Sequence, residues 1–417
     1  MSDLSCRKAK RRVQIKGIDG QVRGGLAVNI TQKKHEFLFG CGAFDVMAYV
    51  SAKDQETKDF FWYRIEKELE VLNYMTVPVY WGRYEPTEGQ TNFENTMKCA
   101  QFLKEHGVIT KGHPLCWHTV CADWLLKYDD ETIYKKQLER IKREVEQFKG
   151  CIDAWDVINE TVIMPVFDKY DNAVTRICNK YGRIPLIKAV FDEAFAANEN
   201  ATLLINDFNT TKDYEKVIEE CLEAGVKLNT IGIQSHQHQG YWGVEKINDV
   251  CDRFSKYGLP IHFTENTILS GDLVPEYIED LNDWQVDVWP SSEESEELQA
   301  RQVEEMYRTL FEKPMVKAIT WWDFADGAWL NAPSGVIARE NRCKKSYERL
   351  VNLINKEWKT SYVSKTDKDG YVLIDGFKGE YEISVAASYA DETCVAQSNK
   401  AIYNLSDESE DKGVIVL

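Results

Sequence analysis

The 417-residue chain contains 43% hydrophobic and 29% charged residues, the composition of a globular protein with enough apolar material for a large core. Its formal net charge of −17 argues against nucleic acid or an anionic membrane surface as the main partner and favours an uncharged substrate. No run of about 18 apolar residues occurs, and no apolar stretch follows the charged N-terminus as in a signal peptide. We therefore expect a cytoplasmic protein, or a secreted one if a signal peptide precedes this sequence in the natural protein.

Short β-rich runs alternate with helical patterns through most of the chain. The expected strands are 37–41, 74–81, 108–116, 152–159, 202–207, 229–235, 260–265 and 317–322. The expected helices are 56–72, 92–106, 129–148, 184–199, 213–225, 244–256, 294–312 and 345–357. Eight strands, each followed by a helix, predict an α/β fold of the (β/α)8 TIM-barrel type. A doubly wound open sheet is the alternative, but the G-x-G-x-x-G of its dinucleotide-binding form is absent after the first strand.

The two ends of the chain do not follow this alternation. Residues 11–36 indicate two strands around a glycine-rich turn, and residues 360–417 contain further strand patterns before an acidic tail. Each end has too few strands to bury a sheet face by itself. We expect one discontinuous β-sandwich module made of residues 1–34 and 358–417, and a catalytic barrel at 35–357.

The eleven cysteines show no C-x-x-C spacing, and their odd number leaves no complete pairing. We expect free thiols in a reducing compartment. The histidine pairs His113 with His118 and His236 with His238 lack the further ligands of a closed zinc site, so no metal and no other cofactor is expected.

Two glutamates each follow or end an apolar run, Glu160 after 152–159 and Glu265 at the end of 260–265. The carboxyl ends of the strands are where a TIM barrel carries its catalytic groups, and glycosidic bond cleavage uses a pair of carboxyl groups. In a retaining mechanism the two groups lie about 5 to 5.5 Å apart, one protonated and one ionised. Burial raises one pKa, and hydrogen bonds to the charged form keep the other low.

Other predicted strands also end in polar and aromatic side chains, which could bind the hydroxyls and the apolar faces of a sugar. The runs are 112–118 (GHPLCWH), 155–160 (WDVINE), 206–209 (NDFN), 234–236 (QSH), 264–265 (TE) and 321–329 (WWDFADGAW). In this order they resemble the strand-end motifs of family-10 glycoside hydrolases, the family of endo-β-1,4-xylanases. The resemblance covers roughly residues 35–357. It implies a (β/α)8 barrel and a retaining O-glycosyl hydrolase in xylan degradation.

The resemblance also implies a role for individual residues. Glu160 matches the general acid/base, Glu265 matches the nucleophile, and Asn159 matches the amide that binds the sugar 2-hydroxyl. His236, with Gln234 near it, matches the imidazole that contacts the nucleophile. The residues that match or replace sugar contacts are His113, Trp117, Trp321, Trp329 and Tyr80. The residues expected to orient others are Asp156, Asn206 and Asp207.

The sequence departs from the family pattern in two places. The family has Glu-Asn-x-x-Lys before a tryptophan on the second strand, where this chain has Thr76, Val77 and Tyr80. Loss of charge-assisted hydrogen bonds, each contributing roughly 1.5–3 kcal/mol, should weaken binding of a second xylose. After the nucleophile, Glu-Leu-Asp becomes Glu265-Asn266-Thr267, and the lost carboxylate argues against an ordinary pH profile. The insertion 268–298 could cap the pocket, with Trp284 and Trp289 meeting the leaving group, or could be solvent-exposed.

We therefore expect an enzyme acting on xylan-derived oligosaccharides or small β-glycosides. Its expected partner is this oligosaccharide or small glycoside substrate, with no nucleic acid and no membrane. A β-glycosidase specific for another sugar and a catalytically silent carbohydrate-binding barrel remain alternatives. The sequence leaves the exact sugar, endo or exo action and the oligomeric state open.

Overall fold

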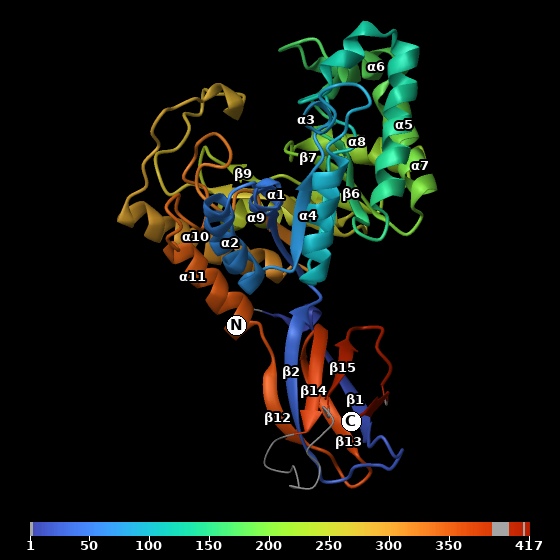
Figure 1. Ribbon diagram of the computed structural model, residues 1–417, viewed down its shortest axis with the longest axis vertical. Helices are drawn as coiled ribbons and strands as arrows, with labels where there is room; N and C mark the ends of the chain where they lie inside the picture. Colours follow the sequence, from blue (N-terminus) through green and yellow to red (C-terminus); the bar gives the residue numbers. More distant parts are fainter. Residues whose placement is uncertain (1–2, 386–399, 412) are drawn as a thin grey trace. The chain divides into compact units, whose positions relative to one another are not determined.

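The computed structural model describes residues 3–385, 400–411 and 413–417, which form two compact units (Figure 1). One unit comprises Phe39–Leu310 and Met315–Glu348, and the other comprises Met1–Leu38, Phe311–Pro314 and Arg349–Leu417. Cys394 lies outside the described residues, whereas the ten described cysteines are free thiols. Within the described ranges, no helix has the length and apolar character needed to cross a lipid bilayer.

The larger unit is built on a parallel sheet that closes on itself. Its strands are β3 (Leu38–Gly42), β4 (Tyr74–Pro78), β5 (Ile109–His113), β6 (Ala154–Asn159), β7 (Thr202–Asp207), β8 (Thr230–Ile233), β10 (Ile261–Ile268) and β11 (Val316–Trp321). Neighbouring strands pair in chain order, and β11 lies between β10 and β3, which closes the sheet. A two-residue strand, β9 (His236–Gln237), pairs with the outer end of β10. The predicted (β/α)8 barrel is confirmed, with β6 as its fourth strand and β10 as its seventh.

Helices follow the barrel strands. Their bounds are α1 (Phe44–Ser51), α2 (Gln55–Val71), α3 (Trp81–Tyr84), α4 (Phe93–Glu105), α5 (Asp130–Phe148), α6 (Ala173–Tyr181), α7 (Arg183–Ala197), α8 (Lys212–Glu223), α9 (Gly243–Ser255), α10 (Glu293–Phe311) and α11 (Lys345–Asn352). In α5, the Asp129 side chain accepts the Thr132 backbone N–H at 2.8 Å and caps the helix. Ile133, Ile141 and Val145 then recur on one buried face. The same spacing made this helix predictable.

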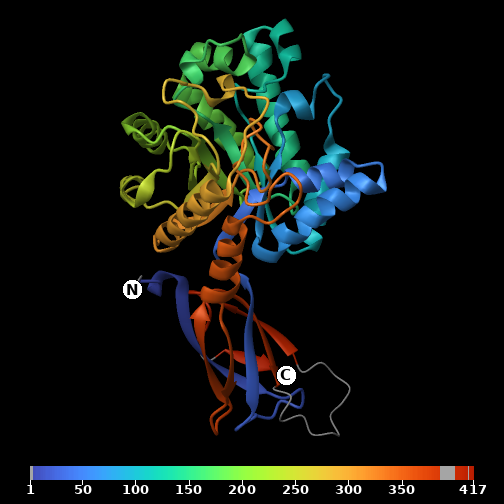
Figure 2. The ribbon, with the colours of Figure 1, turned by 90° about the vertical axis from the view of Figure 1, so that its left-hand side faces the viewer.

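The smaller unit is a sandwich of strands from both ends of the chain. One sheet contains β1 (Lys8–Lys16), β13 (Tyr371–Phe377) and β16 (Val414–Val416). The other contains β2 (Ala27–His35), β12 (Ser361–Lys365), β14 (Gly379–Val385) and β15 (Lys400–Leu405). In Figure 2 the blue N-terminal strands lie among the orange and red C-terminal ones. Apolar side chains of the two sheets form a shared core, as expected for a sandwich: Val13, Ile15, Val28, Ile30, Ile374, Tyr381, Ile383 and Leu405.

Residues 311–314 and 349–357 belong to the sandwich unit, although they lie within the expected barrel segment 35–357. The buried guanidinium of Arg7 donates to the carbonyl oxygens of Phe311 at 2.7 Å and Lys313 at 2.6 Å. The Phe311 ring stacks on Trp358 with 4.1 Å between ring centroids. Contacts between residues this far apart in the chain leave no local sequence signal. The sequence therefore could not show that residues 311–314 and 349–357 belong to the sandwich unit.

Candidate active site

Glu160 follows directly after β6 and has a positive φ of 57°. Its Oε2 accepts a hydrogen bond from Trp117 Nε1 at 2.9 Å, and its Oε1 accepts one from Asn159 Nδ2 at 3.1 Å. Gln234 Nε2 lies 3.5 Å from the same Oε1. The side chain keeps 15% of its surface exposed, so a ligand can reach the carboxyl group.

Asp207, the last residue of β7, holds the turn that carries Glu160. Its Oδ2 accepts hydrogen bonds from Thr161 Oγ1 at 3.1 Å and from the Val162 backbone N–H at 3.0 Å. Burial raises the pKa of Asp207 to about 6, against the lowering effect of these hydrogen bonds and one from Asn209. Because the strained φ of Glu160 needs support from its surroundings, Asp207 fixes the direction of the glutamate side chain.

Glu265 lies inside β10, and 5% of its side-chain surface is exposed. Its Oε1 accepts a hydrogen bond from Asn206 Nδ2 at 2.8 Å, and its Oε2 lies 3.1 Å from His236 Nε2. Both carboxylate oxygens therefore have a partner that fixes their orientation.

Amide side chains connect the two glutamates. Asn206 Nδ2, besides contacting Glu265, donates to Asn159 Oδ1 at 2.7 Å, and Asn159 Nδ2 in turn donates to Glu160. Gln234 Nε2 also donates to Asn159 Oδ1, at 3.0 Å. Thr264 Oγ1 donates to Asn206 Oδ1 at 2.7 Å, which fixes the orientation of the Asn206 amide. With Trp117 on Glu160 and His236 on Glu265, the structure thus brings seven of the residues predicted from the sequence into one hydrogen-bonded network.

The pKa values of the two glutamates are displaced in opposite directions. Burial raises the pKa of Glu160 to about 8, and the charges of Asp207 and Glu265 add to this, whereas the Trp117 hydrogen bond opposes it. Burial alone would also raise the pKa of Glu265, but the charges of His113, His236 and Lys111 and the His236 hydrogen bond together lower it below its usual value. Near neutral pH the site therefore contains one carboxylic acid and one carboxylate.

Lys111 is a buried residue of the site that the sequence analysis did not identify. Its Nζ lies 2.5 Å from Asp156 Oδ2, and His113 Nδ1 lies 2.7 Å from the same oxygen. The charge of Lys111 is the main influence that offsets burial and lowers the pKa of Asp156. Asp156 thus orients His113 and compensates the charge of a lysine that helps to keep Glu265 ionised. The sequence could have indicated Lys111, because a lysine within the apolar run 108–116 needs a buried acidic partner.

Aromatic rings surround His113 and His236. The ring centroid of His113 lies 5.6 Å from Tyr80, 6.2 Å from Trp117 and 5.3 Å from Trp322. Trp329 lies 4.5 Å from His236. These rings and imidazoles give the site both apolar faces and polar groups, as a sugar pocket requires.

Trp321 does not line this site. Its indole is fully buried, donates from Nε1 to the Ser334 carbonyl oxygen at 2.9 Å and packs on Tyr307 of α10. The neighbouring Trp322 faces His113 and His236 instead. The tryptophan that lines the site is therefore Trp322, one residue after the predicted Trp321. Neighbouring residues along an extended backbone point to opposite faces, so a difference of one residue exchanges a buried indole for one that faces the site.

The structure places the residues that differ from the family pattern on the second strand and after Glu265. Thr76 and Val77 are both buried in β4. Tyr80 contacts His113 with its ring. The Thr267 hydroxyl lies 3.5 Å from His236 Nδ1 and 3.1 Å from His238 Nδ1. A neutral hydroxyl therefore stands beside His236 where the family motif has a carboxylate.

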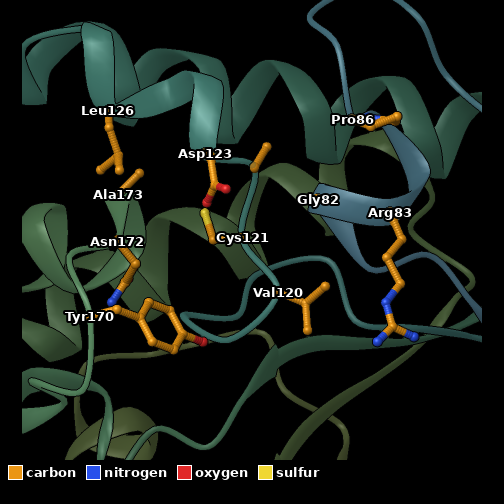
Figure 3. A pocket seen from close by; sticks show the side chains of 11 residues that line it. Gly82, Arg83, Pro86, Val120, Cys121, Asp123, Leu126, Tyr170, Asn172 and Ala173 are labelled. Atoms are coloured by element: carbon orange, nitrogen blue, oxygen red, sulfur yellow. The ribbon is translucent and has the colours of Figure 1, made fainter.

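A separate hollow of about 440 Å³ lies between the segments that follow β4, β5 and β6 (Figure 3). Arg83 and Tyr170 extend on either side of Val120 there, and Asp123 and Asn172 also line it. The described residues that line this hollow include neither glutamate. No cluster of potential metal ligands occurs within the described part of the chain.

Replacing Trp117 with phenylalanine should raise the pKa of Glu160 further, because the substitution removes a hydrogen bond to the carboxylate. We expect the alkaline limb of kcat/KM to move upward by about one pH unit. The measurement is the pH dependence of kcat/KM, which reports the free enzyme. Trp124→Phe is the matched control, because Trp124 donates to the Glu85 carbonyl oxygen. An unmoved alkaline limb in Trp117→Phe would contradict the prediction.

A closed parallel barrel with a carboxylic acid directly after its fourth strand and a carboxylate in the carboxyl-terminal half of its seventh is the arrangement of a glycoside hydrolase. The model of glycosyl hydrolase family 10 matches residues 66–352. This match covers more than half of the chain, and the chain belongs to glycosyl hydrolase family 10. The resemblance found in the sequence motifs is confirmed.

Curated relatives and solved structures agree with the family. An endo-1,4-beta-xylanase/feruloyl esterase of Xylanibacter ruminicola is 26% identical over 293 residues, which are 60% of this chain and 37% of that protein. The anti-sigma-I factor RsgI6 of Acetivibrio thermocellus is 24% identical over 388 residues, which are 90% of this chain and 45% of that protein. The chain thus spans less than half the length of these two relatives. Xylanase 10B of Thermotoga petrophila, solved in complex with xylobiose, shares the fold with a TM-score of 0.62 and 22% identity, covering 77% of this chain and 95% of that one.

Proposed function

We propose that this protein is a retaining glycoside hydrolase that cleaves β-linked xylosides, either xylan-derived oligosaccharides or small β-glycosides, by double displacement. The observation that carries the proposal is that Glu160 and Glu265 are joined through Asn159 and Asn206 in one hydrogen-bonded site. The pKa values of the two glutamates are displaced in opposite directions, which agrees with it. A retaining glycosidase needs this division between a proton donor and a nucleophile. The endo-1,4-beta-xylanases among the relatives support xylose as the reacting sugar.

In the first step, a Glu265 oxygen attacks the anomeric carbon and the bond from that carbon to the leaving oxygen breaks. Glu160 transfers its proton to the leaving oxygen, so the leaving group departs as a neutral alcohol. His236 and Asn206 hold the attacking carboxylate in place. We assign to Asn159 the contact with the sugar 2-hydroxyl, because its amide lies between the two glutamates.

In the second step, Glu160 is ionised and removes a proton from water. The resulting hydroxide equivalent attacks the anomeric carbon, and the bond to Glu265 breaks, which restores both carboxyl groups. Two inversions at the same carbon retain the β configuration. Burial favours the protonated form of Glu160, so each cycle ends with the acid ready for the next substrate.

His113, Trp117, Tyr80 and Trp329 are the proposed contacts of the reacting sugar, with Gln234 and His236 completing its polar side. The buried Thr76 and Val77 provide no charged group for a second sugar on the non-reducing side. This favours short glycosides over extended xylan. The same apolar substitution is the reason to keep a β-glycosidase for another sugar as a second candidate.

The proposal is tested by incubating the protein with aryl β-xyloside, aryl β-glucoside and xylo-oligosaccharides and by following the anomeric configuration of the first product with NMR. We expect hydrolysis of the xyloside with retained configuration. An α-configured first product would reject double displacement, and preference for the glucoside would favour the second candidate. A folded protein that binds these sugars without turnover would identify a carbohydrate-binding barrel instead.

A further inference from the structure

Residues 269–290 form a long segment between β10 and α10, which we call the strap. It is the gold loop containing a short helical turn in the upper left of Figure 1. Connections after a barrel strand usually have about 2 to 6 residues, so the strap is additional material at the end of the strand that carries Glu265.

The strap has a small hydrophobic core of its own. Leu269, Val274 and Trp289 pack together with Ala332, and Trp284 contacts this group from the side. Trp289 is 8% exposed and donates from Nε1 to the Asp272 carbonyl oxygen at 2.9 Å. The strap is therefore a folded element, and Trp289 serves its packing instead of facing a leaving group.

Lys169 connects the strap to the other side of the active site. Its Nζ lies 2.6 Å from Asp280 Oδ2 and 2.7 Å from Asp283 Oδ1. Lys169 belongs to the segment that follows Glu160, and two residues before it Phe167 packs on His118 with 4.4 Å between ring centroids. His118 Nε2 in turn lies 3.8 Å from Glu160 Oε2. The ion pairs thus join the strap to the immediate surroundings of the proposed acid.

The strands at the two ends of this connection are β6 and β10, which β7 and β8 separate in the barrel. The strap therefore passes the carboxyl ends of β7 and β8. The proposed sugar contacts Tyr80, His113 and Trp329 end or follow β4, β5 and β11, on the other side of the two glutamates. Gln234 and His236, which follow β8, contact the glutamates themselves. Since the leaving group must lie beside its proton donor, it occupies the side where the strap runs.

We propose that the ion pairs of Lys169 with Asp280 and Asp283 determine specificity by holding the strap across the leaving-group side, which restricts the enzyme to short leaving groups. This inference rests on the proposed function. Xylosides with an aryl or single-sugar leaving group fit under a closed strap, whereas a long chain of sugars requires the strap to be displaced. Lys169, Asp280 and Asp283 influence which substrates bind, and they do not take part in bond cleavage.

The ion pairs are partly exposed, with 39% of the Lys169 side chain and 35% and 58% of the two aspartates open to solvent. Exposed pairs are weakened by salt, because the screening length falls to about 3 Å at 1 M. High ionic strength should therefore raise kcat/KM for xylotetraose relative to that for an aryl xyloside in the wild-type protein.

The decisive variant is Lys169→Glu, which replaces two attractions with two repulsions. We expect kcat/KM for xylotetraose and xylohexaose to rise about fivefold, with the value for 4-nitrophenyl β-xyloside unchanged within about twofold. Lys188→Glu is the matched control, because Lys188 is 41% exposed and pairs with Asp192 at 2.8 Å within α7. Adding Asp280→Lys and Asp283→Lys to Lys169→Glu should restore the wild-type preference.

Amide hydrogen exchange over residues 276–286 supplies a readout that needs no turnover, and we expect faster exchange in Lys169→Glu. Unchanged exchange, or the same dependence on chain length in the wild type and Lys169→Glu, would overturn the role of the ion pairs while leaving the proposed function in place. A folded wild-type protein inactive on every substrate would instead overturn the proposed function.

Discussion

Glu265→Ala should lower kcat on every substrate by about 10⁴-fold, because no other group can form the glycosyl-enzyme intermediate. The cavity left by the shorter side chain has room for a small anion. Added azide should therefore restore part of the rate on an activated aryl xyloside and yield the α-glycosyl azide. The measurement is steady-state kinetics with and without azide, together with the configuration of the product by NMR.

The rescue experiment separates loss of the nucleophile from loss of the fold. A β-glycosyl azide as the sole product would assign the nucleophile to another residue. Wild-type turnover by Glu265→Ala would reject the assignment altogether. Asn206→Ala, which removes one hydrogen bond to Glu265, should reduce kcat without azide rescue, because the carboxylate remains present.

Glu160→Gln should slow hydrolysis in proportion to how much the leaving group needs a proton. We expect a fall in kcat/KM of about 10³-fold on xylobiose and a much smaller effect on 2,4-dinitrophenyl β-xyloside, whose phenolate leaves without protonation. Removal of the intermediate also needs Glu160 as a base, so a burst of dinitrophenol should precede slow turnover. Equal losses on both substrates would contradict the role of Glu160 as proton donor.

The same substitution should stabilise the folded protein at high pH. The pKa of Glu160 is about 8 in the folded protein, above the ordinary value of 4.5, so the folded state binds more protons than the unfolded state between these two values. The free energy of unfolding therefore falls as the pH rises through this window. Neutral glutamine removes that loss, and we expect a higher Tm than in the wild type at pH 9 but not at pH 4.

Glu85→Gln is the control of opposite sign. Burial raises the pKa of Glu85, but the hydrogen bond and the charge of Arg143, at 2.7 Å, outweigh it and leave the pKa lowered. The carboxylate therefore contributes stability that is present above the ordinary pKa and lost as the pH falls through the folded value. Glu85→Gln should therefore lower the Tm at pH 9. A higher Tm at pH 9 for both Glu160→Gln and Glu85→Gln would contradict the expected relation between the pKa shift and stability.

Glu160 and the amides Asn159 and Asn206 could be predicted because they lie where buried strands end, and the apolar runs marked those ends. Glu265 could be predicted because the apolar run 260–265 ends there, although β10 continues to Ile268. The tryptophan that lines the site, Trp322, could not be predicted in the same way, because two tryptophans, Trp321 and Trp322, stand next to each other at the end of β11. The ladder between β10 and β11 shifts register between Phe263 and Asn266, and Asn266 then opposes Trp321. A count of alternating residues cannot include a shift of this kind.

Other parts of the site depended on partners distant in sequence. A lysine in a buried strand is unfavourable unless an acid compensates it, and the compensating Asp156 belongs to the next strand. Whether Trp289 faces a ligand or packs in the strap was likewise decided by Leu269, Val274 and Ala332. Such choices depend on tertiary packing, which local patterns do not contain.

The pairing of β1 with β13 has a consequence during synthesis on the ribosome. Arg12 pairs with Leu373, so the first strand emerges long before its partner exists. An unpaired strand can associate with other chains, and charged side chains oppose this. Strand β1 carries Lys8, Lys10, Arg11 and Arg12 within its first five residues. These basic side chains thus oppose association of β1 with other chains until synthesis reaches β13, its partner.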